Sequence, residues 1–247
     1  QQATPIEGEA IEQVQLKVKP ISSCQVISNP GYYILNTDLT QIGTCFTITS
    51  SDVVLDGRDA ITGEKHKISI TGSGNAVSIE SSSRRALENI VIKNLITDAG
   101  IGKQYYRQVN SVTIEDSDFT NAWFPGSDDV TIRNSNFNGL NIVAGEGSNC
   151  ADPSIMDPPL GAMIINNTIV GDAGSMVVFT ASDCFQRVST RHVIENNTII
   201  NYWPYADDCG TSGCISSGHS KTFYFAAGSS DNIIKNNKII VSGKSIP

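Results

Sequence analysis

The sequence predicts an all-β protein that folds as a β-solenoid, a coil of short strands stacked rung upon rung. Two observations predict this fold: an octet that recurs along the chain, and hydrophobic residues that alternate with polar ones inside each copy. The octet is VIENNTII at Val193–Ile200, with near copies MIINNTIV at Met163–Val170 and IIKNNKII at Ile233–Ile240. A repeat this short cannot bury a hydrophobic face alone, so its copies are expected to stack.

The repeat extends beyond these three octets when they are aligned on an isoleucine that precedes an Asn or Asp by two positions. The aligned pairs are Ile92/Asn94, Ile114/Asp116, Ile132/Asn134, Ile164/Asn166, Ile194/Asn196 and Ile234/Asn236. Successive isoleucines are 22, 18, 32, 30 and 40 residues apart. The repeating unit is therefore near 20 residues long, and the later copies carry loop insertions.

Within each copy the hydrophobic period is two, which is typical of strands with one buried face. The stretches Ser111–Phe119 (SVTIEDSDF) and Asp129–Phe137 (DVTIRNSNF) show it most clearly. Only Ile6–Gln15 has a weak helical pattern, and the VQLKVK that begins at Val14 alternates like a strand. We therefore expect an N-terminal strand or extension over residues 1–22 and a single solenoid domain over residues 23–247.

The Asn column suggests an asparagine ladder inside one turn of the coil. Asn tolerates the left-handed backbone of sharp turns, and stacked amides can satisfy one another's buried polar groups. The predicted ladder is Asn94, Asp116, Asn134, Asn166, Asn196 and Asn236. Asn166 and Asn196 also begin Asn-x-Thr glycosylation sequons, and an inward orientation predicts that both stay unmodified.

The charge balance excludes some partners. The chain has 17 Lys plus Arg against 25 Asp plus Glu, a net charge of −8, whereas nucleic acid and anionic membranes require basic patches. No apolar run approaches the roughly 18 residues of a spanning helix. The chain opens on Gln1-Gln2 without Met, so we expect a mature secreted chain after signal-peptide removal, or a trimmed one.

Six cysteines, with no spacing that suggests a metal site, indicate disulfides and an extracellular or cell-surface location. Six cysteines allow fifteen connectivities, and we expect the sequential one. The expected pairs are Cys24–Cys45, Cys150–Cys184 and Cys209–Cys214.

From about Val53 to Val241 the repeat resembles that of the right-handed parallel β-helix superfamily, which includes pectate lyases, polygalacturonases and many secreted surface proteins. The preceding segment Ser23–Gly57 is similar to the entry segment of secreted β-helix proteins, with a Cys pair, Pro-Gly-x-Tyr and Val-x-Leu-Asp-Gly. The resemblance implies a right-handed parallel β-helix. Because that superfamily is functionally broad, it does not imply one activity.

Candidate catalytic residues are sparse. The polygalacturonase family brings acids and a His together from neighbouring rungs. Here Asp38 of Asn36-Thr37-Asp38 lies about 90 residues before Asp128-Asp129, and that acidic pair lies about 90 residues before His219. A lyase would need carboxylates that hold Ca²⁺ and a basic residue, and we otherwise expect no cofactor and no metal. The weak catalytic candidates are Asp128, Asp129, Asp207, Asp208 and His219.

Aromatic residues gather at one predicted edge of the coil. Trp123 and Trp203 each follow the leading isoleucine of their copy by nine residues, and an acidic pair follows each Trp. Aromatic faces with nearby acids suit sugar rings, although aromatics that cap the flank of a coil would show the same pattern. The predicted ligand-binding residues are Trp123, Phe124, Trp203, Tyr205, Tyr105 and Tyr106.

Two functions fit these patterns. The favoured one is an extracellular structural or adhesive subunit of a surface layer, sheath or filament. Its partners would be copies of itself, stacked head-to-tail through an open C-terminal rung, or a surface polysaccharide. The alternative is a secreted lyase, hydrolase or epimerase that acts on acidic polysaccharide. The few catalytic candidates and the short segment after Val241 favour the first.

Overall fold

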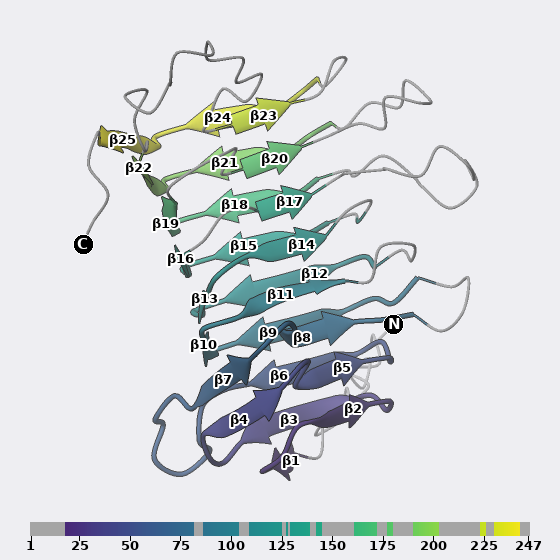
Figure 1. Cartoon of the computed structure of the whole chain (residues 1–247). Coiled ribbons are helices and arrows are strands. Elements are labelled where there is room, and N and C mark those ends of the chain that lie inside the picture. The colour runs from purple at the N-terminus through teal and green to yellow at the C-terminus, as the bar shows by residue number, and fades with distance from the viewer. Residues whose placement is uncertain are drawn as a thin grey trace, which may run out of the picture.

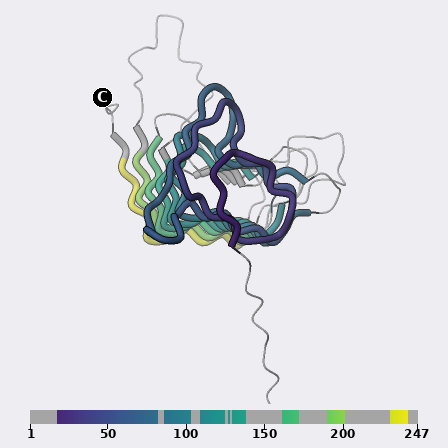
Figure 2. The backbone as a smooth tube through the Cα atoms, turned by 90° about the horizontal axis from the view of Figure 1, so that it is seen from below, coloured from purple at the N-terminus to yellow at the C-terminus, as the bar shows by residue number. Residues whose placement is uncertain are grey.

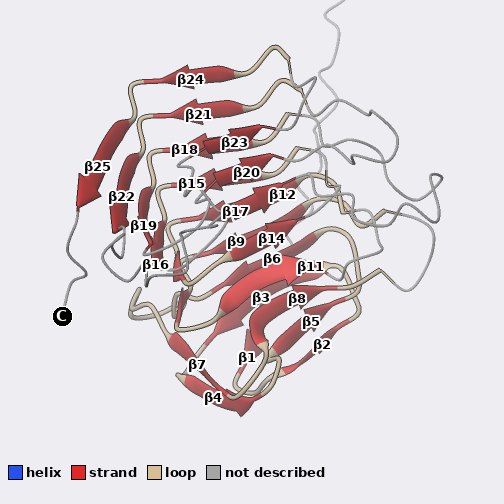
Figure 3. Cartoon of the chain, turned by 45° about the horizontal axis from the view of Figure 1, so that its top comes forward, coloured by secondary structure: helices blue, strands red, loops and turns tan. Residues whose placement is uncertain are grey.

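The computed structural model contains only strands among the elements that it describes, and these stack into one column from β1 to β24 and β25 (Figures 1 and 3). The described residues are 18–81, 86–103, 109–124, 127, 129–138, 142–144, 161–171, 177–179, 190–202, 223–225 and 230–242. Seen along the column, successive rungs overlie one another (Figure 2).

The strands form three sheets, and every pairing within them is parallel. The first sheet contains β1 (Val18–Ile21), β3 (Gly31–Leu35), β6 (Val53–Asp56), β9 (Ile90–Lys93), β12 (Val112–Glu115), β15 (Thr131–Arg133), β18 (Met163–Ile165), β21 (Val193–Glu195) and β24 (Ile233–Lys235). The second contains β4 (Leu39–Ile42), β7 (Lys67–Thr71), β10 (Ile96–Thr97), β13 (Asp118–Phe119), β16 (Asn136–Asn138), β19 (Thr168–Gly171), β22 (Thr198–Tyr202) and β25 (Lys238–Ser242). The third contains β2 (Gln25–Ile27), β5 (Phe46–Ile48), β8 (Asn75–Ile79), β11 (Gly100–Lys103), β14 (Ala122–Phe124), β17 (Ile142–Ala144), β20 (Val177–Phe179) and β23 (Phe223–Phe225).

A full rung takes one strand from the first sheet, then one from the second, then one from the third, as β12, β13 and β14 do. The next strand then returns to the first sheet and pairs in parallel with the first-sheet strand of the preceding rung, as β12 does with β9 and β15 does with β12. This is the connectivity of a parallel β-helix. The predicted all-β parallel β-helix is therefore confirmed.

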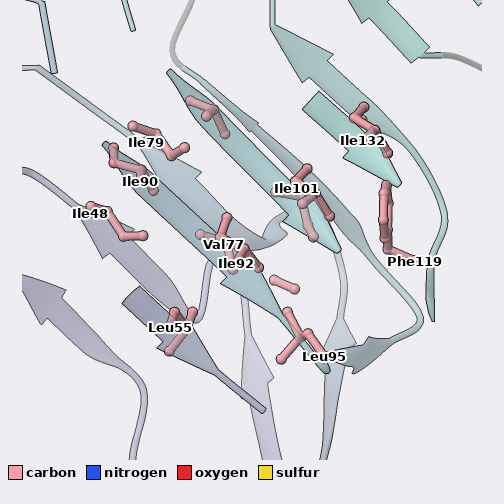
Figure 4. Packing of buried hydrophobic residues seen from close by; sticks show 14 of the residues in the cluster. Ile48, Leu55, Val77, Ile79, Ile90, Ile92, Leu95, Ile101, Phe119 and Ile132 are labelled. Atoms are coloured by element: carbon pink, nitrogen blue, oxygen red, sulfur yellow. The ribbon is translucent and has the colours of Figure 1, made fainter. Parts of the chain in front are cut away.

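The core is made of aliphatic rows that run the length of the coil. In the first sheet the leading isoleucines of five repeat copies, Ile92, Ile114, Ile132, Ile164 and Ile194, are in register and have no exposed surface. Side chains from the other two sheets meet this row, as Figure 4 shows for Ile101 and Phe119. Phe119 also packs edge-on against Phe137 at a centroid distance of 4.2 Å. The period-two pattern thus identifies the buried face correctly.

Two columns of left-handed residues flank the first sheet and turn the chain into and out of it. The entering column contains Asp52, Asn89, Ser111, Asp129, Gly161, Arg191 and Asp231. The leaving column contains Asn94, Asp116, Asn134, Asn166, Asn196 and Asn236, with φ between 52° and 57°. Asn and Asp suit these positions because they adopt the left-handed conformation at the lowest cost among residues other than Gly.

The leaving column is the one predicted to be the buried ladder, and that prediction is wrong by one residue. All of its members except Asn94 are exposed, whereas the residues that follow them face the interior. The true ladder is Ser117, Ser135, Asn167, Asn197 and Asn237. In each step a backbone N–H donates to the side-chain oxygen of the next rung, at 2.9–3.1 Å.

The first rung is short, because β1 leads directly into β2 without a strand of the second sheet. β1 pairs in parallel with β3, so the expected boundary between residues 22 and 23 falls inside this rung. The predicted disulfide Cys24–Cys45 is confirmed, with 4.6 Å between its Cα atoms, and it ties the first rung to the second. Cys150, Cys184, Cys209 and Cys214 lie outside the described residues.

The outer face of the first sheet carries a row of charges that alternate in sign. In register, the row reads Asp56, Lys93, Glu115, Arg133, Ile165, Glu195 and Lys235. Its members pair between neighbouring rungs, as Lys93 does with Asp56 at 3.5 Å and Lys235 with Glu195 at 3.1 Å. Arg133 and Glu115 form the third pair. Because the register places opposite charges side by side, this row favours the native stacking over a slipped one.

Candidate functional site

Three of the predicted catalytic and ligand-binding residues can be placed in the structure: Trp123, Phe124 and Asp129. The other predicted ligand-binding residues, Trp203, Tyr205, Tyr105 and Tyr106, lie outside the described residues. So do the other weak catalytic candidates, Asp128, Asp207, Asp208 and His219.

Phe124 is a core residue, so its predicted role in ligand binding is wrong. It lies at the end of β14 with no exposed surface, and it ranks among the largest fully buried side chains. Alternation along the strand explains this, because Ala122 and Phe124 face the interior while Trp123 between them does not.

Trp123 is half-buried and lies on the outward-facing position of β14. Its register partners are Gly102 of β11 on the preceding rung and Val143 of β17 on the following rung. A Cβ atom at Gly102 would lie 3.0 Å from the backbone oxygen of Trp123 and 3.1 Å from its Cβ. The glycine therefore permits close packing of these two rungs.

Asp129 is exposed and has a φ of 51° in the entering turn column. Its Oδ1 is 2.8 Å from the point where a Cβ on Gly161 of the next rung would lie, so that glycine allows its carboxylate to sit close to the neighbouring backbone. These contacts are those of a turn residue, and they account for an Asp at this position without a catalytic role.

The sequence did not single out a polar cluster on the outside of the first sheet, formed by Tyr32, Asp56, Lys93 and Asn94. Asp56 accepts hydrogen bonds from Tyr32 Oη (2.6 Å), Asn94 Nδ2 (2.8 Å) and the backbone N–H of Arg58 (3.0 Å). Lys93 Nζ lies 3.5 Å from Asp56 and 5.1 Å from the centre of the Tyr32 ring. Asp56 is only 6% exposed, so these partners replace the water that it loses.

The pKa shifts in this cluster hold each group in its ordinary charge state at neutral pH. Burial acts to raise the pKa of Asp56, but hydrogen bonds from Tyr32, Asn94 and Arg58 and the charge of Lys93 bring it below its usual value. Burial also raises the pKa of Tyr32, with a further contribution from Asp56. The pKa of Lys93 is raised by Tyr32 and Asp56 against the opposing effect of burial. A general acid or base needs the opposite shifts, so these pKa directions favour a structural role for the cluster.

His66 lies between two carboxylates near the edge of the second sheet. Its Nδ1 is 3.2 Å from Asp38 Oδ1, and its Nε2 is 3.8 Å from Asp59 Oδ2. A hydrogen bond from the Lys67 backbone N–H, then one from His66, lowers the pKa of Asp38. Across the part of the chain that the structure describes, no three His, Cys, Asp or Glu side chains are arranged to hold a metal ion.

The two ends of the coil differ. At the C-terminal rung, Ile234 and Ile239 are 47% and 46% exposed, although their equivalents one rung earlier, Ile194 and Ile199, are fully buried. At the N-terminal rung, Ile21 and Ile27 are buried.

A charged side chain occupies the core row at the N-terminal end. Lys19 holds the first-rung position of the row that ends at Ile234, and its Nζ donates to Pro30 O at 3.0 Å and Tyr33 Oη at 3.1 Å. Pro20 follows it in the same edge strand. An inward-pointing Lys and an edge Pro are devices that prevent edge-to-edge association.

The strand pairing defines the chain as an all-β parallel β-helix protein. No protein-family model and no curated protein sequence matches it. Among solved structures, the crystal structure of the Dettilon tailspike protein aligns with a TM-score of 0.35 and 10% sequence identity. That alignment covers 91% of this chain and 61% of the tailspike chain, so this chain spans less than two thirds of its length. The described residues contain no long apolar helix of the kind that crosses a membrane.

Proposed function

We propose that this protein is an extracellular structural or adhesive β-helix subunit that associates with copies of itself through its C-terminal rung. The extracellular location is supported by the Cys24–Cys45 disulfide, since disulfides persist mainly in oxidising compartments. The structural role is supported by the polar groups of the first sheet, which are matched to one another within the coil.

One observation carries the self-association: the exposed core positions of β24 and β25. Ile234 and Ile239 are each nearly half exposed at this end, and the adjoining strand edges have no further rung in the described part of the chain. Aliphatic surface beside open strand edges is the combination that recruits another β-strand surface. A second copy of this chain is the occupant that we propose.

The arrangement that we favour joins two C-terminal rungs. Head-to-tail stacking, which the sequence suggested, would continue the core row from Ile234 onto Lys19 of the next copy and bury a charge against an aliphatic side chain. A symmetric pair instead places Ile234 of one copy near Ile234 of the other. Such a contact closes on itself as a dimer, whereas head-to-tail contact continues as a filament or ring.

Sedimentation of the 1–247 chain over a range of concentrations tests both points. We expect a dimer that does not grow further and that Ile239→Asp converts to a monomer. The matched control is Ile42→Asp, which changes an aliphatic side chain of the opposite end that is 83% exposed, and it should leave the dimer intact. Filaments or rings that both substitutions disrupt would support self-association but overturn the symmetric arrangement. A wild-type chain that stays monomeric at high concentration would overturn the proposal itself.

Carbohydrate binding is a second candidate, and the half-buried Trp123 on the outward-facing position of β14 supports it. Indole rings on the outside of a protein can stack on the C–H faces of sugar rings. Binding to immobilised surface polysaccharides should be lost in Trp123→Ala and kept in Trp123→Phe. The enzymatic alternative has a separate readout, the release of unsaturated or reducing ends from uronate polymers with and without Ca²⁺. Equal binding by Trp123→Ala would remove this candidate.

A further inference from the structure

The two glycosylation sequons lie on the outside of the coil, contrary to the expectation from the sequence. They are Asn166-Asn167-Thr168 and Asn196-Asn197-Thr198, at the corner between the first and second sheets. Asn166 and Asn196 are exposed, whereas the middle residues Asn167 and Asn197 are 2% and 1% exposed. The corner thus separates the roles of two adjacent asparagines: the first is available to modification and the second holds the ladder.

The amide groups of the exposed pair are weakly engaged. Asn166 Nδ2 lies 3.4 Å from Asn134 Oδ1, and Asn196 Nδ2 lies 3.4 Å from Glu195 Oε1. The ladder amides, by contrast, donate over 2.8–3.0 Å. Substitution at Nδ2 of Asn166 or Asn196 therefore costs little, and it leaves in place the backbone bonds from Asn166 N to Glu195 O and from Asn196 N to Lys235 O.

We propose that this corner carries an N-linked glycan. The donor is an oligosaccharide attached through its anomeric carbon to a lipid-linked phosphate. The Asn Nδ2 forms a bond to that carbon, the carbon–oxygen bond to the phosphate breaks, the lipid phosphate leaves with the electron pair, and the amide loses one proton. The Thr two positions later completes the acceptor motif. Thr168 and Thr198 are register partners and are only half-buried, on the outside of β19 and β22.

The register also limits occupancy. Asn166 and Asn196 are on successive rungs, which are separated by roughly 4.8 Å, the spacing of neighbouring strands. Two branched glycans attached that close together would compete for the same space above the corner. We therefore expect one glycan per molecule, distributed over the two sites. The same turn recurs at Asn134 and Asn236, but Asn136 and Lys238 stand where a sequon needs Ser or Thr, so these corners stay bare.

The test is the intact mass of the chain secreted from a eukaryotic host, before and after enzymatic removal of N-linked glycans. The expected mass exceeds the 26.4 kDa polypeptide by one glycan and falls to the polypeptide mass after treatment. Thr168→Val and Thr198→Val keep a β-branched residue on the strand, so each single variant should retain one glycan through the other site. The double variant should retain none.

Three outcomes would contradict the inference. A wild-type chain at the polypeptide mass would overturn the modification, and a glycan that survives in the double variant would place it elsewhere. Two glycans on one molecule would overturn the limit on occupancy. Thermal unfolding of the double variant shows whether its fold is intact, and peptide mapping must find Asn134 and Asn236 unmodified. None of these readouts depends on self-association.

Discussion

Asn197 Oδ1 accepts two hydrogen bonds from Asn167, one from its backbone N–H at 2.9 Å and one from its Nδ2 at 3.0 Å. The same two bonds connect Asn197 to Asn237 on the next rung. Each amide also donates back to the sheet of the preceding rung, as Asn197 Nδ2 does to Ile164 O at 2.8 Å. One buried side chain therefore satisfies polar groups on both neighbouring rungs, which makes the ladder a determinant of stacking register.

Replacing Asn197 tests the ladder directly. Asn197→Ala leaves the N–H of Asn167 and the carbonyl of Ile164 without their side-chain partner, whereas Asn167 Nδ2 keeps its bond to Ile132 O. At about 1–3 kcal/mol for each of these two buried unsatisfied groups, we expect a loss of about 3 kcal/mol in the free energy of unfolding. Asn197→Ser should cost less, because Ser117 and Ser135 hold the same position in earlier rungs. Urea denaturation measures both.

The neighbouring residue supplies the control. Asn196 is exposed with a φ of 57°, so Asn196→Ala should cost only about 1–2 kcal/mol, the penalty of the left-handed conformation, and Asn196→Gly should be close to neutral. Equal losses for Asn196→Ala and Asn197→Ala would contradict this assignment of the two asparagines.

The sequence predicts the repeat, the strand period, the buried isoleucine row and the disulfide nearest the N-terminus, because each leaves a local or periodic signal. It misplaces the ladder because a single left-handed residue at the corner shifts the inward-outward alternation by one position. A signal was available: Ser117 and Ser135 replace Asn in the true column, whereas Asp116 and Asn134 precede them. Small hydroxyl residues after an Asn or Asp identify the inward position.

The Tyr32–Asp56–Lys93 cluster could not be predicted in this way. Its residues lie on three consecutive rungs, and their contact depends on the exact register of β3, β6 and β9. The repeat alignment begins at Ile92, so it reaches only the last of these three rungs. Only the stacking itself reveals that these side chains share one outer surface.

The cluster predicts a sharp difference between two acidic residues of the same charged row. Asp56→Ala removes the acceptor of Tyr32 and Asn94 and leaves Lys93 without its partner, so we expect a loss of about 3 kcal/mol, as for a broken buried ion pair. Glu115→Ala removes a pair whose arginine is half exposed, and its cost should stay below about 1 kcal/mol. Chemical denaturation at neutral pH compares the two variants, and similar costs would contradict the buried role of Asp56.

The same carboxylate gives a pH dependence of known sign. Because the pKa of Asp56 is lower in the folded chain than its ordinary value, its contribution to stability is present above that ordinary value, near pH 4, and is lost as the pH falls further. Asp56→Asn should therefore flatten the decline of stability at acid pH. If the free energy of unfolding of Asp56→Asn falls with acid as steeply as that of the wild type, other carboxylates dominate the decline.

Gly57, at the end of the Val-x-Leu-Asp-Gly segment, is required by close contact between rungs. A Cβ atom at this position would lie 2.5 Å from the backbone oxygen of Asn94, which cannot move without disturbing the next rung. Gly57→Ala should therefore cost more than about 2 kcal/mol, in the range of an overpacked core. Gly63→Ala is the reference, since nothing lies within 4 Å of its Cβ position and only its φ of 73° opposes the change, at about 1 kcal/mol. Thermal unfolding compares the two variants, and equal losses of stability in Gly57→Ala and Gly63→Ala would contradict the predicted clash.

We expect His192 to make the coil sensitive to mild acid. It has no exposed surface, its Nδ1 accepts a hydrogen bond from the Ala162 backbone N–H at 3.2 Å, and burial lowers its pKa to about 4. In the unfolded chain His192 binds a proton near pH 6.5, whereas in the folded chain it stays neutral until about pH 4. The contribution of His192 to the free energy of unfolding is therefore fully present above pH 6.5 and falls as the pH drops toward 4. The loss over this window reaches about 3 kcal/mol, at about 1.4 kcal/mol for each pKa unit.

The variant that isolates this effect is His192→Asn, because Asn232 fills the equivalent position one rung later and accepts a hydrogen bond from the His192 backbone N–H at 3.0 Å. An Asn at position 192 keeps a side-chain acceptor for Ala162 but does not titrate. The free energy of unfolding, measured by urea at intervals between pH 7 and pH 4.5, should therefore fall less steeply in His192→Asn than in the wild type. If the two curves run parallel over this window, protonation of His192 does not control acid stability.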